Sequence, residues 1–345
     1  MKKNKNKVLI TGHSGFVGSW LFYYLKKKKY DVYGISLAPK NKSELFYKLK
    51  INLEKSSSIQ NILNYKLLDK YIRKIRPNII IHLAAESLVL KSMNNPNLTY
   101  TTNINGTLNM LNIIRSYDFI STGIFFTTDK VYENNDKKKE FVESDSLGGN
   151  DPYSGSKSAS EMVIKSFTKS YLNEKKIIIL RCGNIIGGGD NGKNRIIPDI
   201  IRSIRGRKTL KIRNPKSTRP WQHILDVIYI LYFLIKRTQN KKSFFQIFNI
   251  SSNTKPQTVQ KIVLDFRKKF YFKFKIFKTK NFEKKFLNLN SKKIFKYYKL
   301  KNYFNSYTSV FEVIKFYQDL IIKKKKTRHI IDDQIKNYER NSKNL

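Results

Sequence analysis

The sequence predicts an α/β protein in which a doubly wound parallel sheet is followed by a smaller α+β domain. Short apolar runs of strand length alternate with segments of helix length up to about residue 184, and a glycine-rich turn separates the first strand from the first helix. Beyond residue 184, glycines and prolines interrupt this pattern. Strands that alternate with helices form right-handed βαβ units, whose parallel sheet is covered on both faces.

The expected elements follow one another along the chain. Apolar runs predict strands at residues 8–10, 31–35, 79–81, 123–126 and 176–180. Helices are expected at about residues 16–25, 66–75, 103–116 and 153–171. We therefore expect a first domain over residues 1–184 with a returning strand near 245–250, a second domain over 185–322, and a basic tail over 323–345. The tail is expected to be a frayed helix or a solvated arm.

The composition is that of a globular protein with a large excess of positive charge. Hydrophobic residues make up 40% of the chain, and 69 Lys and Arg against 25 Asp and Glu give a formal net charge of +44. Such a charge is typical of proteins that bind nucleic acid. Here the cations are mostly lysines spread along the chain, together with abundant Asn, Ile, Phe and Tyr, as AT-rich codons produce. We interpret the charge as solvated surface and expect no specific nucleic-acid partner.

One segment leaves two interpretations open. Over residues 271–278, Phe272, Phe274 and Ile276 alternate with lysines. Interleaved basic and aromatic residues can bind single-stranded nucleic acid by stacking on its bases. A half-buried strand explains the period of two more simply, and we favour it.

Other sequence features indicate the cellular compartment and limit the possible cofactors. The single cysteine, Cys182, excludes an intramolecular disulfide and is typical of a reducing compartment. The chain shows no signal peptide, and its longest apolar run, residues 224–235, is too short to span a bilayer. We therefore expect a cytoplasmic protein with no membrane partner. Four scattered histidines lack the spacing of metal ligands, so we expect no metal.

The turn after the first strand has the sequence Gly12-His13-Ser14-Gly15-Phe16-Val17-Gly18. Glycines allow a tight turn and a close backbone approach, so that a pyrophosphate can lie against the helix N-terminus. We expect Gly12, Gly15, Phe16, Val17 and Gly18 to bind a dinucleotide. The G-x-x-G-x-x-G spacing resembles that of the extended short-chain dehydrogenase/reductase superfamily, which implies a Rossmann sheet.

Further cofactor contacts are expected at the ends of later strands. Ser36 stands where an acidic residue binds the ribose hydroxyls of NAD, and no arginine nearby would accept a 2′-phosphate, so NAD is favoured. By resemblance, Asn52 and Leu53 occupy the place of an acidic–apolar pair near the adenine. Ala84 and Ala85 would let the backbone pass close to the cofactor.

The catalytic candidates form two pairs. Tyr153 and Lys157 are four residues apart on a predicted helix and so share a face. A nearby ammonium group stabilises a phenolate, which can remove a hydroxyl proton while a hydride leaves the same carbon. Asp129 and Lys130 follow Thr128 directly after a predicted strand, and they add a second acid/base couple. The alternative interpretation of Asp129 and Lys130 is an ion pair on the surface. If both pairs are catalytic, they predict oxidation followed by elimination.

Several separate segments resemble the nucleotide-sugar 4,6-dehydratases, and within them the CDP-glucose branch. They lie at residues 147–153, 181–190, 212–215 and 218–223, and the resemblance extends over about 7–320. The Thr128-Asp129-Lys130 sequence discriminates between branches, because dTDP-glucose enzymes carry Glu after the Asp and C4 epimerases lack the Asp. This chain departs from the family in places, for example with Asn191 where an aromatic residue is usual.

The resemblance implies an NAD-dependent lyase that converts CDP-glucose to CDP-4-keto-6-deoxyglucose in deoxysugar biosynthesis for polysaccharides such as lipopolysaccharide O-antigen. Tyr153 would take the 4-hydroxyl proton, with Lys157 orienting the cofactor ribose and Thr128 bonding to the same hydroxyl. Lys130, as a neutral amine, would remove the C5 proton while Asp129 protonates the departing 6-hydroxyl. Hydride would then return to C6 and regenerate NAD.

The resemblance also implies substrate contacts and an assembly. Arg219 and Arg195 are expected at the diphosphate, because guanidinium groups match phosphate geometry. Asn184 is expected near the sugar and phosphate, Arg213 near the base or ribose, and Ser87 in the sugar pocket. A homodimer through the helix of Tyr153 is expected. The alternatives are a dehydratase or C4 epimerase acting on another nucleotide sugar and, more distantly, a non-catalytic polyanion-binding protein.

Overall fold

The chain forms two compact units. The computed structural model describes residues 6–39, 41–135, 139–238, 242–252, 254–277, 286–300 and 303–342. The first unit comprises Met1–Val131, Leu147–Arg181 and Ile228–Phe248; the second comprises Tyr132–Ser146, Cys182–Val227 and Asn249–Leu345. The chain thus passes between the units several times, a finer division than the expected boundary at residue 184 with a returning strand near 245–250.

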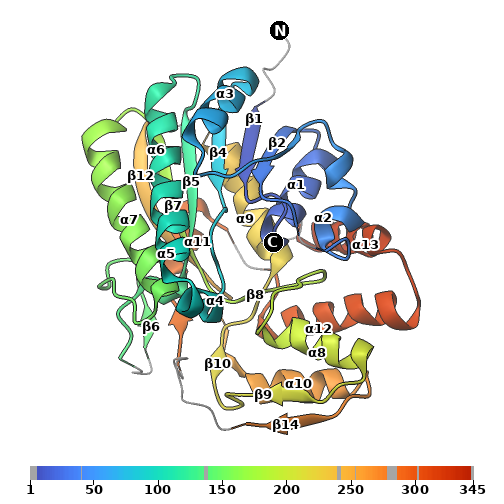
Figure 1. The fold of residues 1–345 in the computed structure, drawn as a ribbon. Coiled ribbons are helices and arrows are strands. Elements are labelled where there is room, and N and C mark those ends of the chain that lie inside the picture. The colour runs from blue at the N-terminus through green and yellow to red at the C-terminus, as the bar shows by residue number, and fades with distance from the viewer. Residues whose placement is uncertain are drawn as a thin grey trace. The chain divides into compact units, whose positions relative to one another are not determined.

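A seven-stranded sheet, counted over the described residues, forms the centre of the first unit (Figure 1). Its strands are β1 (Lys7–Thr11), β2 (Asp31–Ser36), β3 (Ser57–Ile59), β4 (Ile79–His82), β5 (Thr122–Thr128), β7 (Lys176–Cys182) and β12 (Phe244–Ile250). Their order is β12-β7-β5-β4-β1-β2-β3. β1 pairs in parallel with both β2 and β4, so the strand order reverses beside β1 and the doubly wound fold is confirmed.

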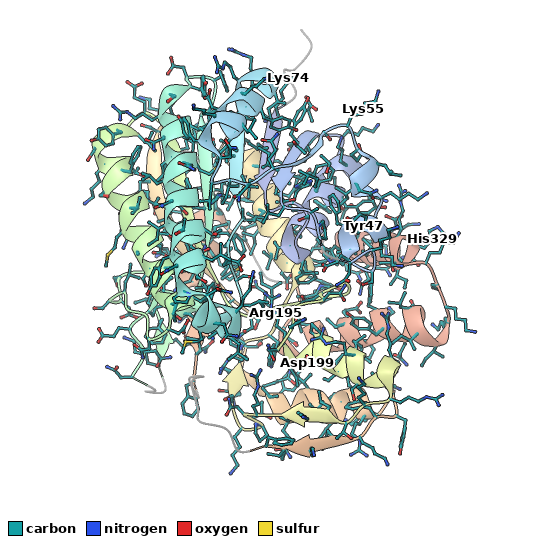
Figure 2. All side chains as sticks on the ribbon, viewed as in Figure 1. Tyr47, Lys55, Lys74, Arg195, Asp199 and His329 are labelled. Carbon is teal, nitrogen blue, oxygen red and sulfur yellow. The ribbon has the colours of Figure 1, made fainter. Side chains whose placement is uncertain are left out.

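Helices of the first unit connect these strands. They are α1 (Phe16–Lys27), α2 (Leu45–Lys48), α3 (Tyr65–Ile75), α4 (Val89–Asn94), α5 (Pro96–Tyr100), α6 (Gly106–Ser116), α7 (Pro152–Tyr171) and most of α9 (Ile224–Arg237). Short helical turns occur at Ile51–Leu53, Thr101–Asn105 and Asp129–Val131. The surface of this unit carries exposed lysines, of which Lys55 and Lys74 are labelled in Figure 2.

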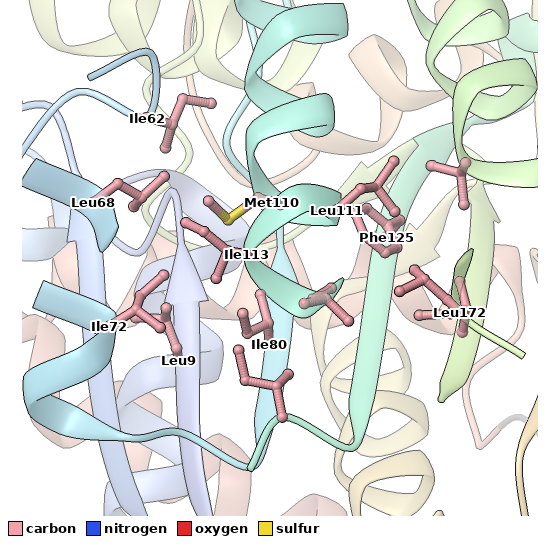
Figure 3. Close-up of a cluster of buried hydrophobic side chains, with 14 of the residues drawn as sticks. Leu9, Ile62, Leu68, Ile72, Ile80, Met110, Leu111, Ile113, Phe125 and Leu172 are labelled. Atoms are coloured by element: carbon pink, nitrogen blue, oxygen red, sulfur yellow. The ribbon is translucent and has the colours of Figure 1, made fainter. Parts of the chain in front are cut away.

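Both faces of the sheet are covered, because successive strand residues are buried on opposite sides. Leu9, Ile80 and Phe125 pack into one core cluster with apolar residues of α3, α6 and α7 (Figure 3). Val8 and Ile10, which flank Leu9, are equally buried and lie outside that cluster. α1 and α9 cover the opposite face (Figure 1). The near-continuous apolar strands of the sequence are therefore explained by burial on two sides.

The second unit is built from short strands and helices. Its strands are β6 (Glu140–Phe141), β8 (Ile185–Ile186), β9 (Leu210–Ile212), β10 (Thr218–Arg219), β11 (Gln222–His223), β13 (Gln257–Thr258), β14 (Phe274–Ile276) and β15 (Asn288–Leu289). Its helices are α8 (Ile196–Gly206), α10 (Val259–Arg267), α11 (Lys292–Tyr298), α12 (Ser306–Tyr317) and α13 (Thr327–Ser342), with a wide turn at Gln318–Ile322. The strands pair two by two as β10–β13, β11–β8, β14–β9 and β15–β6.

The basic–aromatic segment at residues 271–278 is a strand only in part. β14 pairs in parallel with β9, and Phe272 just before it is buried. Ile276, expected on the buried face, is 54% exposed, so the half-buried prediction is wrong at that position. The ladder has only two strands and therefore covers little of either face. Lys278 lies outside the described residues.

The basic tail is neither frayed nor solvated over its described part. α13 buries Ile330, Ile331 and Ile335, and its Tyr338 hydroxyl donates to the buried Asp226 carboxylate at 2.7 Å. The expectation of a solvated arm was wrong because it followed the lysine run at 323–326, whereas the residues after this run carry an apolar stripe at helical spacing. Residues 343–345 lie outside the described chain.

Candidate functional site

The glycine turn after β1 is packed so tightly that two of its glycines admit no side chain. Gly12 has φ +76°, and a Cβ there would lie 2.7 Å from the Ala84 amide nitrogen. A Cβ on Gly18 would lie 2.2 Å from the Gly12 carbonyl oxygen. Gly15 differs, because its Cβ would meet only the Gly12 oxygen, at 3.3 Å. Internal packing explains Gly12 and Gly18, whereas Gly15 is exposed at the start of α1.

The carboxyl end of β2 holds a buried hydroxyl group with no hydrogen-bond partner. Ser36 is 5% exposed, and its Oγ makes no hydrogen bond. The Gly12 amide donates to the Ile35 carbonyl at 2.7 Å, so the glycine turn and the end of β2 are adjacent. An unpaired buried hydroxyl is costly unless a ligand satisfies it. An exposed glycine at the helix start and an unpaired hydroxyl at Ser36 fit the pyrophosphate and ribose of a dinucleotide.

Asn52 and Leu53 do not belong to this site, which corrects the sequence-based assignment. They form an exposed turn before β3, and Glu54 next to them pairs with Lys26 in the last turn of α1 at 3.3 Å. α1 has 12 residues and is therefore about 18 Å long, so this turn lies at the end opposite the glycines.

The residues that lie next to Ser36 are instead those that follow β3, and the sequence analysis did not single them out. The Gln60 amide donates to the Ser36 carbonyl at 2.9 Å, and Asn61 comes next. β3 was overlooked because it is three residues long and rich in serine. The polar pair Gln60-Asn61 after this short strand was the sequence feature that could have indicated this position.

The end of β4 lies beside the glycine turn as expected. The Thr11 Oγ1 accepts from the Ala84 amide at 3.3 Å and hydrogen-bonds His82 Nδ1 at 2.8 Å. Ala84 and Ala85 are half-buried. Burial, aided by the charge of Lys157, lowers the pKa of His82 to about 3. His82 is thus a neutral, hydrogen-bonded residue at the strand end.

Tyr153 and Lys157 lie in the first turns of α7, which begins at a well-formed cap. The Asp151 carboxylate accepts from the Ser154 amide at 3.0 Å, and Pro152 is the first helical residue. Lys157 is buried, and its Nζ donates to the Phe126 carbonyl at 2.8 Å. Burial lowers the pKa of Lys157 to about 8, and the Glu161 carboxylate acts against this shift. At neutral pH an ammonium group therefore faces the end of β5.

Thr128, Asp129 and Lys130 form the end of β5 and the turn after it. Thr128 and Asp129 are buried, and the Thr128 hydroxyl donates to Asp129 Oδ1 at 2.9 Å. Lys130 is half-buried. The Ser158 hydroxyl of α7 donates to the Val131 carbonyl at 2.8 Å, so this turn is fixed to the helix of Tyr153 and Lys157. The structure thus brings the two expected pairs of catalytic residues onto adjoining elements of one unit.

Sequence reasoning missed Asn103, which holds the loop after β4 to α7. Its Nδ2 donates to the Glu86 carbonyl at 3.1 Å and to Ser156 Oγ at 2.9 Å. The wide turn at Thr101–Asn105 places this amide. We found no signal for it, because an Asn at the start of an amphipathic helix is ordinary. Ser87 in the same loop is exposed.

Asn184 and Arg219 lie on neighbouring segments of the second unit. The Asn184 carbonyl accepts from the Gln222 amide at 3.0 Å, and its buried Nδ2 has no hydrogen-bond partner. Arg219 on β10 is 5% exposed and donates to the Thr218 carbonyl at 2.8 Å. A buried unpaired amide donor suits an anionic or hydroxylated ligand.

Arg195 and Arg213 form a second group in that unit. Arg195, the residue before α8 (Figure 2), pairs with the buried Asp190 carboxylate at 3.2 Å. Arg213 is half-exposed and donates to the Asn194 carbonyl at 3.4 Å. The charge of Arg195 is therefore already compensated by Asp190.

The part of the chain that the structure describes contains neither a cluster of metal ligands nor a membrane-spanning helix. Within residues 6–39, 41–135, 139–238, 242–252, 254–277, 286–300 and 303–342, no three His, Cys, Asp or Glu residues gather as metal ligands would. Over the same part of the chain, no helix is long and apolar enough to cross a bilayer.

Comparisons with known proteins identify a family and several relatives. Residues 8–251 match the NAD dependent epimerase/dehydratase family. A CDP-glucose 4,6-dehydratase of Salmonella typhimurium is 37% identical over 64% of this chain and 63% of its own length. A dTDP-D-glucose 4,6-dehydratase of Dictyostelium discoideum is 29% identical over 72% of this chain and 58% of its own length. The chain thus spans about three fifths of these relatives.

A solved structure shows the same fold. The dTDP-glucose 4,6-dehydratase of Bacillus anthracis, in complex with NAD, superposes with a TM-score of 0.76. The alignment covers 91% of this chain and 97% of that structure at 21% identity. Agreement at this identity concerns the fold.

Proposed function

Since the chain belongs to the NAD dependent epimerase/dehydratase family, we propose that it is a nucleotide-sugar 4,6-dehydratase that converts CDP-glucose to CDP-4-keto-6-deoxyglucose. One observation carries the proposal: the buried Thr128-Asp129 pair and Lys130 are fixed to the helix of Tyr153 and Lys157 through Ser158. NAD, when bound, accepts a hydride from the substrate and returns it later. The residues that would hold it are Gly12, Gly15, Phe16, Val17, Gly18, Ser36, Ala84, Ala85, Tyr153 and Lys157.

The first task of the site is to remove the 4-hydroxyl proton. Tyr153 does so as a phenolate, which the charge of Lys157 stabilises. Lys157 is held at the end of β5 by the Phe126 carbonyl, so its charge has a fixed position. Thr128 hydrogen-bonds the same hydroxyl, and without substrate its own hydroxyl donates to Asp129 Oδ1.

The second task is elimination of water across C5 and C6. Once C4 is a ketone, the C5 proton is acidic, and Lys130 removes it as a neutral amine. Asp129 in its protonated form donates to the departing 6-hydroxyl. Epimerisation at C4 has no leaving hydroxyl and needs no such acid. A buried carboxyl group beside the Thr128 hydroxyl therefore favours a dehydratase over an epimerase.

The substrate is assigned from the second unit and from similarity. Arg219 and Asn184 supply a buried cation and an unpaired amide, which suit a diphosphate and the adjoining sugar. Arg195 and Arg213 add contacts to the phosphates and to the base or ribose, and Ser87 to the sugar. CDP-glucose is proposed because the relative at 37% identity is a CDP-glucose 4,6-dehydratase.

We also propose that the protein is a homodimer. Leu98 and Tyr100 on α5 and Met162 on α7 are all exposed large apolar residues. α5 and α7 pack against each other, and we place the dimer contact on these two helices. Sedimentation at micromolar concentration tests this, and a Met162→Glu variant should sediment as a monomer.

The reaction is tested by proton NMR in D2O with catalytic NAD and, in separate samples, CDP-, dTDP-, UDP- and GDP-glucose. A C6 methyl signal with CDP-glucose alone, deuterium at C5 and no net NADH are expected. The same methyl signal with another nucleotide would keep the mechanism and overturn the substrate. Inversion at C4 with an unchanged C6 methylene would show an epimerase. Asp129→Asn is the matched control. This variant should still transfer hydride from C4 of the sugar to NAD, and it should form no methyl group.

A further inference from the structure

Two side chains of α7 bind two consecutive residues of β5. The Lys157 ammonium donates to the Phe126 carbonyl at 2.8 Å, and the Thr127 hydroxyl donates to Glu161 Oε1 at 2.6 Å. Lys157 and Glu161 are four residues apart, so they lie on the same face of the helix. The strand continues directly into Thr128 and the catalytic turn. Glu161 thus fixes the helix of Lys157 against the strand that carries the elimination residues.

Glu161 is fully buried and is paired there with Arg181 at the end of β7. The Arg181 Nε lies 3.0 Å from Glu161 Oε1 and its Nη2 2.6 Å from Oε2, and both side chains are 0% exposed. A buried carboxylate persists only with such a partner. Replacing the pair by apolar residues is often neutral for stability, so a stability role alone does not explain it.

We propose that Glu161 is a positioning residue that keeps Lys157 an ammonium ion held against β5, and that it thereby sets the upper pH limit of proton abstraction by Tyr153. The proposal rests on the function proposed above. The carboxylate offsets the burial of Lys157, which would otherwise favour the neutral amine. Without the ammonium ion, the Tyr153 phenolate loses the charge that stabilises it.

The other groups around this pair do not supply the same charge. His82 on β4 interacts with Lys157, and burial lowers its pKa to about 3, so it is neutral at working pH. Burial also lowers the pKa of Lys165, one turn after Glu161, and the charge there has the same sign as Lys157. Tyr153, Asp129 and Lys130 are the titratable groups to which the proposed reaction itself is assigned. Since burial lowers the pKa of Lys157 to about 8, its charge is lost as pH rises through 8.

The test removes the charge of Glu161 while keeping its shape. Glu161→Gln alone leaves Arg181 buried without a carboxylate and can prevent folding, so the principal variant is Glu161→Gln with Arg181→Gln. Thr127→Val is the matched control, because it removes the hydrogen bond to Glu161 and leaves both charges. Circular dichroism confirms that each variant is folded.

The first measurement needs neither cofactor nor substrate. Trace acetylation with acetic anhydride across pH 6–10, quantified for the Lys157 peptide by mass spectrometry, gives the pH of half-maximal reactivity. An opposite charge at short range shifts a pKa by about one unit or more. Because the double variant also removes the opposing Arg181 cation, this midpoint should shift down by less than about one pH unit, and Thr127→Val should leave it in place. An unchanged midpoint in the folded double variant would overturn the proposal.

The second measurement is single-turnover oxidation of the nucleotide sugar as a function of pH. The alkaline limb should move to lower pH in the double variant by the same amount as the labelling midpoint. Activity that falls equally at every pH would show a purely structural role and refute the inference. A shifted labelling midpoint in a protein that oxidises none of the sugars would leave the inference standing and refute the proposed function.

Discussion

Two alanine substitutions in the glycine turn should separate packing from cofactor binding. A methyl group on Gly18 would lie 2.2 Å from the Gly12 carbonyl oxygen and 2.7 Å from His13 Cα. Both contacts are to backbone, which cannot turn aside. A methyl group on Gly15 would meet only the Gly12 oxygen, at 3.3 Å, and the φ of −73° at Gly15 suits alanine. Gly18→Ala should thus damage the fold, and Gly15→Ala the site.

The expected magnitudes differ accordingly. Gly18→Ala should lower the free energy of unfolding of the first unit by about 1–3 kcal/mol, the usual cost of overpacking. Gly15→Ala should cost only about 1 kcal/mol, because glycine is better than alanine at a helix N-cap. Its methyl group, however, enters the space that fits the pyrophosphate. We expect NAD affinity to fall at least tenfold, equivalent to about 1.4 kcal/mol.

The assay combines urea unfolding with calorimetric titration of NAD. The chain has two tryptophans, Trp20 in α1 and Trp221 in the second unit, so Trp20 fluorescence in a Trp221→Phe background reports the first unit. Wild-type NAD affinity in Gly15→Ala would refute the placement of the pyrophosphate. Wild-type stability in Gly18→Ala would refute the contact between α1 and the turn.

Three further substitutions test other parts of the chain. Tyr153→Phe should reduce turnover by about 10²–10⁴-fold and NAD affinity by much less, and equal losses in both would contradict its role as the base. Tyr338→Phe should lower the stability of the second unit by about 1.5–3 kcal/mol in urea, since its hydroxyl donates to buried Asp226. Burial raises the pKa of Asp226 from 3.8 to about 7, so the folded protein binds the extra proton and stability is lost as pH rises through that interval. Asp226→Asn should therefore gain stability relative to the wild type between pH 4 and 7, and a pH-independent difference would refute this.

The sheet was predictable because its strands are buried on both faces and read as continuous apolar runs. β3 was not, since three residues of which two are serines give no such run. That omission displaced the expected adenine contacts to Asn52 and Leu53, at the wrong end of α1. The prediction for the tail was wrong for a different reason. It was based on the lysine run at 323–326 and overlooked the apolar stripe of α13, which follows this run.

The residues of the candidate site were likewise predictable only in part. Tyr153, Lys157 and the turn after β5 were found because helix spacing and strand ends are local features of a sequence. The Glu161–Arg181 pair and the amide bridge of Asn103 were not, because each joins residues from separate elements and only the folded chain brings them together. The partner of Arg195 in the second unit also became visible only in the structure, where Asp190 compensates its charge.

The distribution of charge argues against polyanion binding as the main function. The chain carries 69 basic and 25 acidic residues, yet among the buried residues that the structure describes there are five acidic side chains and three basic ones. Over the described residues the excess positive charge therefore lies outside the buried core, as Lys55 and Lys74 illustrate (Figure 2). A surface lysine costs little to acquire, whereas a buried charge needs a partner or a function. Lys157, Glu161 and Arg181 are such charges, and they adjoin the turn that carries Asp129. A drift in composition can thus load the exterior with lysine while the chemistry of the interior stays fixed.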